Sequence, residues 1–579
     1  MTATVASPVH VPDAHPAPAR PSRRLTLTVF AVCWVIYLAV GIYLAVDQQY
    51  FFGDALSRVQ AAQSVLYSRD PHLSAIGFIF TPLTAVVQLP LIALSPWFPA
   101  LTADALSSVI MSSAFMAGAV AVLTGVARDR GVPPALTLVV VGAFAVNPMI
   151  VLYGANGMSE APAVFFIVWA ARCLIRWVDT DDVHELVSAG IALALGFLTR
   201  YDLGAAAGLA AFFVAVVSYR RPQRTDKKRQ RALIDAALVL APAGIAFVAW
   251  ALTSWIINGE LLAQFTSEYG NAAIIAQSGG TGSTTTGQAL GFSVTEMLIM
   301  APLLPVLLAA VFVVRARRRR LYPLVAVLVV CVAVLGFQTF TYLRGSTFGF
   351  LRFYLTVVPL AAVVALLAVP ATRLVPWRRL GREATLPTIA DLRRFVYAGL
   401  AVLAAVAMVL AVPVTVAGMG SPKHAPQEFA LRTVVDPDPR SVDKEYLDGR
   451  KVARTFSTER SLADYLDSLN LPDGSVLTDT VYGFAVVVRS RHPKQFVIPS
   501  DQDFPEILND PVHFGVKYML SVPDTGRGKS DALNLRYPTL YETGADIAVL
   551  RMEARNQGQD QPDWRIYEVV GDPGDPGGG

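Results

Sequence analysis

Long apolar runs dominate the first two thirds of the chain. A bilayer core about 30 Å thick requires roughly 20 apolar residues in a helix, because a helix satisfies its own backbone hydrogen bonds. Eleven runs fit this pattern, although the fifth and sixth are short and lie only a few residues apart. We expect membrane-spanning helices at residues 25–46, 103–127, 135–153, 160–178, 186–199, 203–219, 233–257, 294–314, 321–342, 353–369 and 395–417.

One further apolar stretch, at residues 76–94, resembles a twelfth span. Pro82 and Pro90 interrupt it, and proline removes a helix hydrogen bond. Counting this stretch as a span would also invert the charge pattern of every later loop. We therefore expect a re-entrant or interfacial segment, within a first outer loop (residues 47–102) that holds interfacial helices.

The basic residues orient the protein in the membrane. Cytoplasmic loops are enriched in Lys and Arg. With eleven spans, residues 20–24 and the basic runs 220–231, 315–320 and 373–394 fall on one side, whereas residues 259–292 on the other side contain no Lys or Arg. We expect a multi-pass protein of the plasma (inner) membrane, with a disordered cytoplasmic N-terminus at residues 1–24.

Composition supports the membrane assignment. Hydrophobic residues make up 54% and charged residues 16% of the chain, against about 25% charged in soluble proteins, and the mean hydropathy is +0.47. These values exclude a water-soluble architecture. The net charge of +4 is too small to indicate nucleic-acid binding. The three cysteines lie inside apolar runs, so they predict neither disulfides nor a metal knuckle.

After Ala417 the composition changes to that of a soluble domain. Short alternating runs at residues 475–479, 495–499, 518–521, 547–551 and 565–570 predict strands, with a helix at 459–469 among them. The expected fold class is therefore mainly α: a polytopic membrane protein with about 11 transmembrane helices and a C-terminal soluble α/β domain at residues 418–570. An odd number of spans places this domain outside the cytoplasm, and the Gly/Pro-rich tail 571–579 is expected to be disordered.

The first outer loop offers three candidate site residues. Asp54 lies directly after the first span and heads an amphipathic stretch that includes Arg58. An acid there is a candidate general base or metal ligand, or simply the cap of a helix. His72, farther along the same loop, could bind a divalent ion or assist Asp54, although an isolated surface histidine usually does neither. We treat Arg58 and His72 as substrate-binding candidates.

Two later turns on the same side add more charged candidates. Glu160 begins the fourth span, where a carboxylate at membrane depth suggests function or a helix N-terminal charge. Arg200 and Asp202 lie in the turn between the fifth and sixth spans, as an ion pair that binds substrate or holds the turn together.

A final group of candidates lies at the outer mouth of the tenth span. Arg352 has a planar fork that could hold two phosphate oxygens, or it could be an interfacial arginine that extends to water. Tyr354, beside it, is a further substrate-binding candidate. The glycine-rich tract 279–287 lacks the lysine of a nucleotide-binding loop, so we expect a flexible loop or a lid.

Taken in order, these features resemble the GT-C glycosyltransferases, in particular the protein O-mannosyltransferase and aminoarabinose-transferase-like branch. The resemblance covers most of residues 25–370: an acid after the first span, a Thr-Pro-Leu interfacial segment, an Asn-Pro to Glu transition, a Leu-Thr-Arg turn and a late Arg-Phe-Tyr. It implies a GT-C-like membrane domain at residues 25–417 and an outer site that moves a sugar from a polyprenyl phosphate to a glycan, lipid or protein acceptor. Members often carry paired acids after the first span, whereas Gly53 and Ala55 flank Asp54 here.

The chemistry suggests roles for three of the candidates. Displacing a lipid phosphate from a sugar requires a base for the acceptor hydroxyl and positive charge for the departing phosphate. We expect Asp54 to be the base and Arg352 the phosphate clamp in an inverting glycosyltransferase. Glu160 would orient the acceptor or Arg200, or share a divalent cation with Asp54; whether a metal is needed stays open.

Two other functions remain as alternatives. A transporter or flippase of lipid-linked sugars also needs many spans with intramembrane charge, but it would usually show repeated halves, which we do not find. A catalytically silent relative could act as a scaffold in envelope assembly. The glycosyltransferase hypothesis requires Asp54 and Arg352 to converge on one outer cavity.

Overall fold

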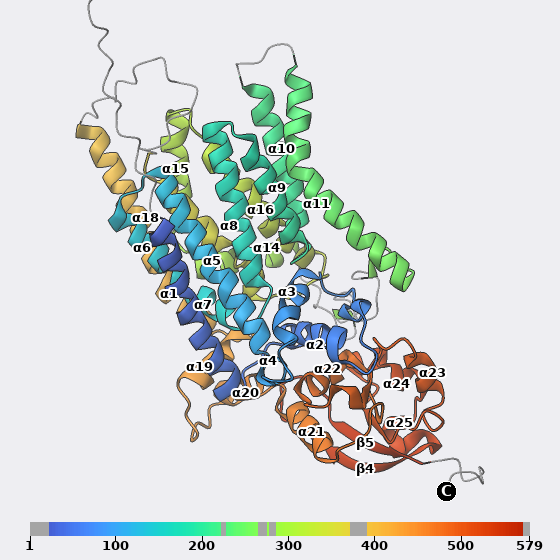
Figure 1. Ribbon diagram of the computed structural model, residues 1–579. Helices are drawn as coiled ribbons and strands as arrows, with labels where there is room; N and C mark the ends of the chain where they lie inside the picture. The colour runs from blue at the N-terminus through green and yellow to red at the C-terminus, as the bar shows by residue number, and fades with distance from the viewer. Residues whose placement is uncertain (1–22, 222–226, 264–274, 277–284, 371–390, 571–579) are drawn as a thin grey trace, which may run out of the picture.

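A bundle of long helices forms most of the protein, and a smaller C-terminal domain lies against one end of it (Figure 1). The computed structural model describes residues 23–221, 227–263, 275–276, 285–370 and 391–570. The expectations for the N-terminal arm, for most of the glycine-rich tract 279–287 and for the tail 571–579 therefore concern residues outside the described part. We call the end of the bundle that carries the C-terminal domain the domain side.

The described helices of the bundle follow the predicted apolar runs closely. They are α1 (Arg23–Ile42) with the π-helical turn η1 (Tyr43–Asp47), α5 (Leu106–Arg130), α6 (Pro134–Ala145), α7 (Pro148–Ala155), α8 (Glu160–Thr180), α9 (Val183–Phe197), α10 (Leu203–Arg220), α11 (Lys228–Asn258), α14 (Thr286–Met300), α15 (Leu304–Arg317), α16 (Tyr322–Leu343), η3 (Leu351–Tyr354), α17 (Val357–Leu367) and α18 (Asp391–Met419).

The chain is a multi-pass membrane protein, although the count of eleven spans is not confirmed. Seven helices within the described residues are long and apolar enough to cross a membrane, and two bent helix pairs raise the number to at most nine. The remaining two predicted spans are the short apolar helices α9 and α17. Each predicted span is thus largely helical, but four of the eleven are broken or short.

Proline explains both bends. The α6–α7 pair bends by 56° where Pro148 follows Asn147, whose side chain accepts a hydrogen bond from Met149 N at 3.1 Å and so caps α7. The α14–α15 pair bends by 82° beside Pro302. In both places a proline next to the break disfavours continuing the preceding helix.

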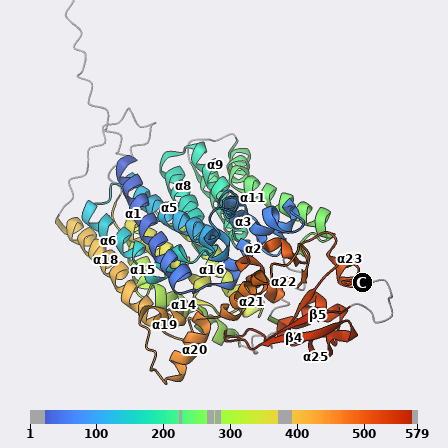
Figure 2. The same cartoon turned by 60° about the horizontal axis from the view of Figure 1, so that its bottom comes forward.

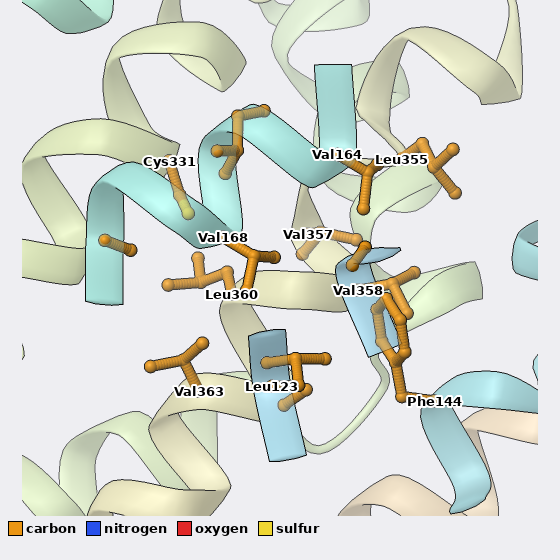
Figure 3. Close-up of a cluster of buried hydrophobic side chains, with 14 of the residues drawn as sticks. Leu123, Phe144, Val164, Val168, Cys331, Leu355, Val357, Val358, Leu360 and Val363 are labelled. Carbon is orange, nitrogen blue, oxygen red and sulfur yellow. The ribbon is translucent and has the colours of Figure 1, made fainter. Parts of the chain in front are cut away.

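The short helix α17 forms the centre of the bundle. All eleven of its residues are buried, as expected for a helix that is apolar on every face. Figure 3 shows its side chains packed against Leu123 of α5, Phe144 of α6, and residues of α8 and α16. Arg315 donates to the carbonyl oxygen of Leu367 at 3.1 Å and so caps the end of α17. This packing fixes η3, which directly precedes α17 and carries Arg352.

Residues 47–102, the predicted first outer loop, fold between the bundle and the C-terminal domain (Figure 1). It contains α2 (Gly53–Tyr67), η2 (Leu73–Ile76), α3 (Leu83–Ile92) and α4 (Ala100–Ala103). The stretch 76–94 forms only the ten-residue α3 and the turns around it. A helix of that length is about half as long as a span requires.

A mixed sheet organises the C-terminal domain. Its five strands lie in the order β2-β1-β3-β5-β4, with β1 parallel to β2 and β3, and β5 antiparallel to β3 and β4. All five strands coincide with predicted ones. The described elements are η4 (Glu428–Ala430), α19 (Leu431–Val435), α20 (Lys444–Ala453), α21 (Ser457–Ser468), β1 (Val476–Leu477), α22 (Thr480–Arg489), η5 (Pro493–Gln495), β2 (Phe496–Val497), α23 (Phe504–Asn509), β3 (Tyr518–Ser521), η6 (Gly526–Ser530), α24 (Ala532–Arg536), α25 (Leu540–Thr543), η7 (Gly544–Asp546), β4 (Ala548–Ala554) and β5 (Trp564–Val569).

Ion pairs and a cation–π contact between Arg460 and Phe51 hold this domain against residues 51–104. Helices α2 and α22 lie side by side where the domain meets the bundle (Figures 1 and 2). Asp104 accepts hydrogen bonds from Arg460 at 2.7 Å and from Arg489 at 3.1 Å. Arg69 pairs with Asp501 at 3.4 Å. These contacts make the C-terminal domain a wall of the space described next.

Candidate active site

A cavity of about 660 Å³ lies between the bundle and the C-terminal domain. Its lining comes from α2, from the α9–α10 turn, from the end of α16, from the segment leading into η3 and from the C-terminal domain. This volume falls within the usual range for small-molecule sites, about 300–1,000 Å³. Asp54, Arg58, Arg200, Asp202 and Arg352 all line it.

The structure brings Asp54 and Arg352 together. Asp54 lies in the first turn of α2, and its side chain is 39% exposed. Arg352 Nη1 donates to Asp54 Oδ2 at 3.0 Å. Burial raises the pKa of Asp54, but the charges of Arg352 and Arg58 lower it by more than burial raises it. The pKa of Asp54 therefore lies below its usual value. The cavity therefore holds an ionised carboxylate beside a guanidinium.

Glu160 lies behind this pair. It is 3% exposed and does not line the cavity. Its Oε1 accepts from Arg200 Nη1 at 2.9 Å and lies 3.7 Å from Arg352 Nη1. The turn before α8 depends on Gly157, because its φ is +77° and a Cβ there would lie 2.1 Å from Ser108 Oγ. Glu160 thus bridges two guanidinium groups that come from different turns.

The predicted ion pair between Arg200 and Asp202 is present. Arg200 donates through both Nε and Nη2 to Asp202 Oδ2, each at 3.1 Å. Gln338 Nε2, from α16, donates to the same oxygen at 2.7 Å. Asp202 is 2% exposed. The turn between α9 and α10 is therefore held rigidly at the cavity wall.

Aromatic rings limit where the guanidinium groups can point. Arg58 lies 4.3 Å from the ring centroid of Phe80, and its Nη1 donates to the backbone oxygen of Asp54 at 3.0 Å. Arg352 lies 5.0 Å from the centroid of Phe353. Such cation–π contacts add attraction and direct the planar groups. Three arginines of the membrane domain therefore face one cavity in fixed positions.

Two sequence candidates lie elsewhere. Tyr354 is 1% exposed, its hydroxyl lies 2.7 Å from Ser293 Oγ, and it does not line the cavity. It joins the end of η3 to α14 instead. The ring Nδ1 of His72 lies 2.7 Å from the backbone oxygen of Asp70, and this residue is also absent from the lining. The structure does not bring His72 to Asp54.

The C-terminal domain contributes residues that the sequence did not reveal. Arg527 of η6 lines the cavity, as do Gln559, Asp560 and Gln561 of the β4–β5 loop. No local motif marks these residues. Only the placement of the domain over α2 makes them part of the site, and nothing in a single sequence predicts that placement.

The carboxylates do not form a metal centre among the described residues. No group of three or more His, Cys, Asp or Glu side chains within that part of the chain could hold an ion. Arg352 Nη1 lies between Asp54 and Glu160, at the position that a cation shared by the two carboxylates would take. The donor set does not fit a shared metal, and we derive no catalytic step through one.

Comparisons with known proteins agree on the fold. Residues 102–250 match the family described as dolichyl-phosphate-mannose-protein mannosyltransferase. The structure resembles ArnT from Cupriavidus metallidurans bound to undecaprenyl phosphate, with a TM-score of 0.53 and 13% identity over 95% of this chain and 99% of that one. The apo ArnT structure gives a TM-score of 0.54 and 14% identity over 94% and 98%. No curated protein sequence matches the chain.

Proposed function

We propose that this chain is an inverting glycosyltransferase of the GT-C type, because residues 102–250 match the protein-mannosyltransferase family and the fold resembles that of ArnT. The donor is a polyprenyl-phosphate-linked sugar, and the acceptor is a hydroxyl group of a glycan, lipid or protein outside the cytoplasm. The observation that carries this proposal is the pair formed by Asp54 and Arg352 in one cavity.

Asp54 acts as the general base. Its carboxylate takes the proton of the acceptor hydroxyl, whose oxygen forms a bond to the anomeric carbon as the bond from that carbon to the phosphate oxygen breaks. The phosphate leaves with the bonding electron pair. The low pKa of Asp54 keeps it ionised before the step. A single displacement of this kind inverts the anomeric carbon.

Arg352 stabilises the departing phosphate. Arg200 supports it from the adjacent turn, where Glu160 holds both guanidinium groups. Positive charge that is already oriented before reaction stabilises the negative charge that develops on the leaving group. Glu160 and Asp202 are positioning residues in this mechanism, because Glu160 Oε1 and Asp202 Oδ2 accept hydrogen bonds from Arg200.

An apolar pocket beside the cavity suits the polyprenyl tail. It has a volume of about 330 Å³, is lined by residues of α9, α10, α11 and α16, and shares Tyr201 and Phe337 with the cavity. A tail in this pocket would deliver its phosphate next to Arg200. The ArnT structure named above contains undecaprenyl phosphate, and we propose the same class of carrier here.

The ends of the helices support an outward-facing site. The end of α10 and the start of α11 lie away from the domain side (Figure 1), and they carry Arg220, Lys228 and Arg229. Basic residues prefer the cytoplasmic side. We therefore propose that the domain side, with the cavity, faces away from the cytoplasm.

A reconstitution assay tests the proposed function. Purified protein in liposomes would be incubated with a panel of radiolabelled polyprenyl-phosphate sugars and a membrane extract as acceptor source. The expected result is a labelled product with inverted anomeric configuration, read by nuclear magnetic resonance. Translocation of the donor without a new glycosidic bond would favour the transporter alternative, and neither activity with any donor would favour the scaffold.

A further inference from the structure

Two arginines on the cavity wall have no carboxylate partner among the described residues. Arg58 lies on α2, one turn after Asp54, and Arg527 lies on η6 of the C-terminal domain. Within that part of the chain, no Asp or Glu oxygen lies within 4.0 Å of either guanidinium. Arg200 and Arg352, by contrast, each lie within 4.0 Å of two carboxylates.

Burying these two charges is costly. Arg58 is 7% exposed, and the Nε atoms of Arg58 and Arg527 are buried without a hydrogen-bond partner. Burial lowers the pKa of both guanidinium groups, although the nearby charge of Asp54 acts in the opposite direction. A buried cation without a carboxylate in direct contact is less stable than a paired one. Such a cost is offset when the cavity receives an anion.

Arg527 is fixed in position before any ligand arrives. Its Nη2 donates to the backbone oxygen of Val481 at 3.0 Å, and it lies 5.1 Å from the ring centroid of Tyr482. Its loop is tightly packed, because a Cβ at Gly528 would lie 2.1 Å from Pro523 O. A guanidinium held in this way loses little freedom when it binds a phosphate or carboxylate.

We propose that Arg527 forms a second anion-binding site in this cavity, which holds a phosphate or carboxylate group of the acceptor. The assignment to the acceptor rests on the proposed function. In a single displacement, the nucleophile and the leaving group lie on opposite sides of the reacting carbon, so the hydrogen bond between Asp54 and Arg352 opens when both substrates are bound. The donor phosphate is placed by Arg352 and Arg200, next to the apolar pocket between bundle helices. Arg527 comes from the part of the wall that the C-terminal domain forms, and its guanidinium is near enough to Asp54 to feel the charge of that carboxylate. We place the acceptor on this side.

A binding experiment on the full-length protein tests this site without requiring turnover. The protein in detergent is first saturated with undecaprenyl phosphate, and inorganic phosphate is then titrated at constant ionic strength while thermal unfolding is followed. We expect wild-type protein to bind phosphate under these conditions, and Arg527→Gln to bind it at least about tenfold more weakly, since a charge-assisted pair is lost. Arg527→Lys should fall between them, and a parallel titration with acetate tells carboxylate from phosphate.

Lys529→Gln is the matched control. It removes the same charge from the same loop, but Lys529 is exposed and does not line the cavity, so its phosphate affinity should equal that of the wild type. Equal affinities in Arg527→Gln and Lys529→Gln would overturn the proposal. Loss of phosphate binding by wild-type protein once undecaprenyl phosphate is present would also overturn it, because Arg527 would then hold the lipid phosphate. The protein could also bind phosphate through Arg527 and yet fail to bind undecaprenyl phosphate. That result would support this site and contradict the proposed donor.

Discussion

Replacing Asp54 by Asn isolates the role of the proposed base. The substitution keeps the size of the side chain, and the amide oxygen can still accept the hydrogen bond that Arg352 Nη1 donates at 3.0 Å. What disappears is the negative charge and the ability to take a proton. Because Asp54 is 39% exposed toward the cavity, the loss of its charge should leave the fold intact.

The size of the effect follows from that geometry. A positioned general base contributes about 100- to 10,000-fold to a rate, so we expect kcat to fall by about that factor, or roughly 3–5 kcal/mol in activation free energy. The KM for the anionic donor should stay constant or fall, because Arg352 then keeps only Glu160, at 3.7 Å, as a counter-charge. A loss in kcat without a rise in KM identifies a group that acts in the transition state.

Initial rates of sugar transfer in liposomes, measured across donor concentrations, supply both constants. Asp448→Asn is a suitable control, because Asp448 lies on α20 with a side chain 43% exposed and is absent from the cavity lining. Equal apparent melting temperatures for the two variants would show that folding is unchanged. A kcat for Asp54→Asn within about threefold of the wild type would refute Asp54 as the base.

Three further substitutions test the neighbouring parts of the account. Arg352→Lys keeps the charge but loses the planar fork, so kcat/KM for transfer should fall about 10- to 100-fold. An unchanged kcat/KM would mean that only the charge of Arg352 matters, and not its two parallel hydrogen bonds. Asp104→Asn weakens the contact to Arg460, whose side chain is 7% exposed, and should cost about 1–3 kcal/mol, seen as a lower melting temperature and faster proteolysis between the domains. Burial raises the pKa of Asp501 to about 6, whereas the same carboxyl in an unfolded chain has a pKa of about 4. The folded protein therefore binds the carboxyl proton of Asp501 more tightly than the unfolded chain does. As the pH rises from about 4 to about 6, the loss of this proton lowers the free energy of unfolding. Asp501→Asn should remove that part of the pH dependence of the melting temperature, and identical slopes in both proteins would contradict it.

The sequence was sufficient to predict where helices form, because long apolar runs leave few alternatives in a membrane protein. It did not separate a helix that spans the membrane from one buried in the bundle. Residues 353–369 are apolar enough for a span, yet they form the last residues of η3 and the short α17, fully enclosed by neighbouring helices. Periodicity reports that a face is buried, not whether lipid or protein buries it.

The candidate site was predicted in part. Asp54, Arg200, Asp202 and Arg352 meet at one cavity, as expected from charged residues that recur on one side of the membrane. Tyr354 and His72 are not on its wall, because neighbouring positions along a chain do not determine which way a side chain faces.

The contribution of the C-terminal domain could not have been predicted. Arg527 reaches the cavity only because ion pairs and a cation–π contact hold the domain against residues 51–104. Those contacts join residues hundreds of positions apart in the chain. A single sequence carries no signal that pairs them.

A structure of the protein with bound undecaprenyl phosphate would show whether Arg352 holds the donor phosphate. We predict phosphate oxygens within hydrogen-bonding distance of the guanidinium of Arg352, the tail in the apolar pocket that Tyr201 and Phe337 border, and Asp54 free to face an acceptor. A phosphate bound outside the cavity, with Arg352 still paired only to Asp54 and Glu160, would contradict it.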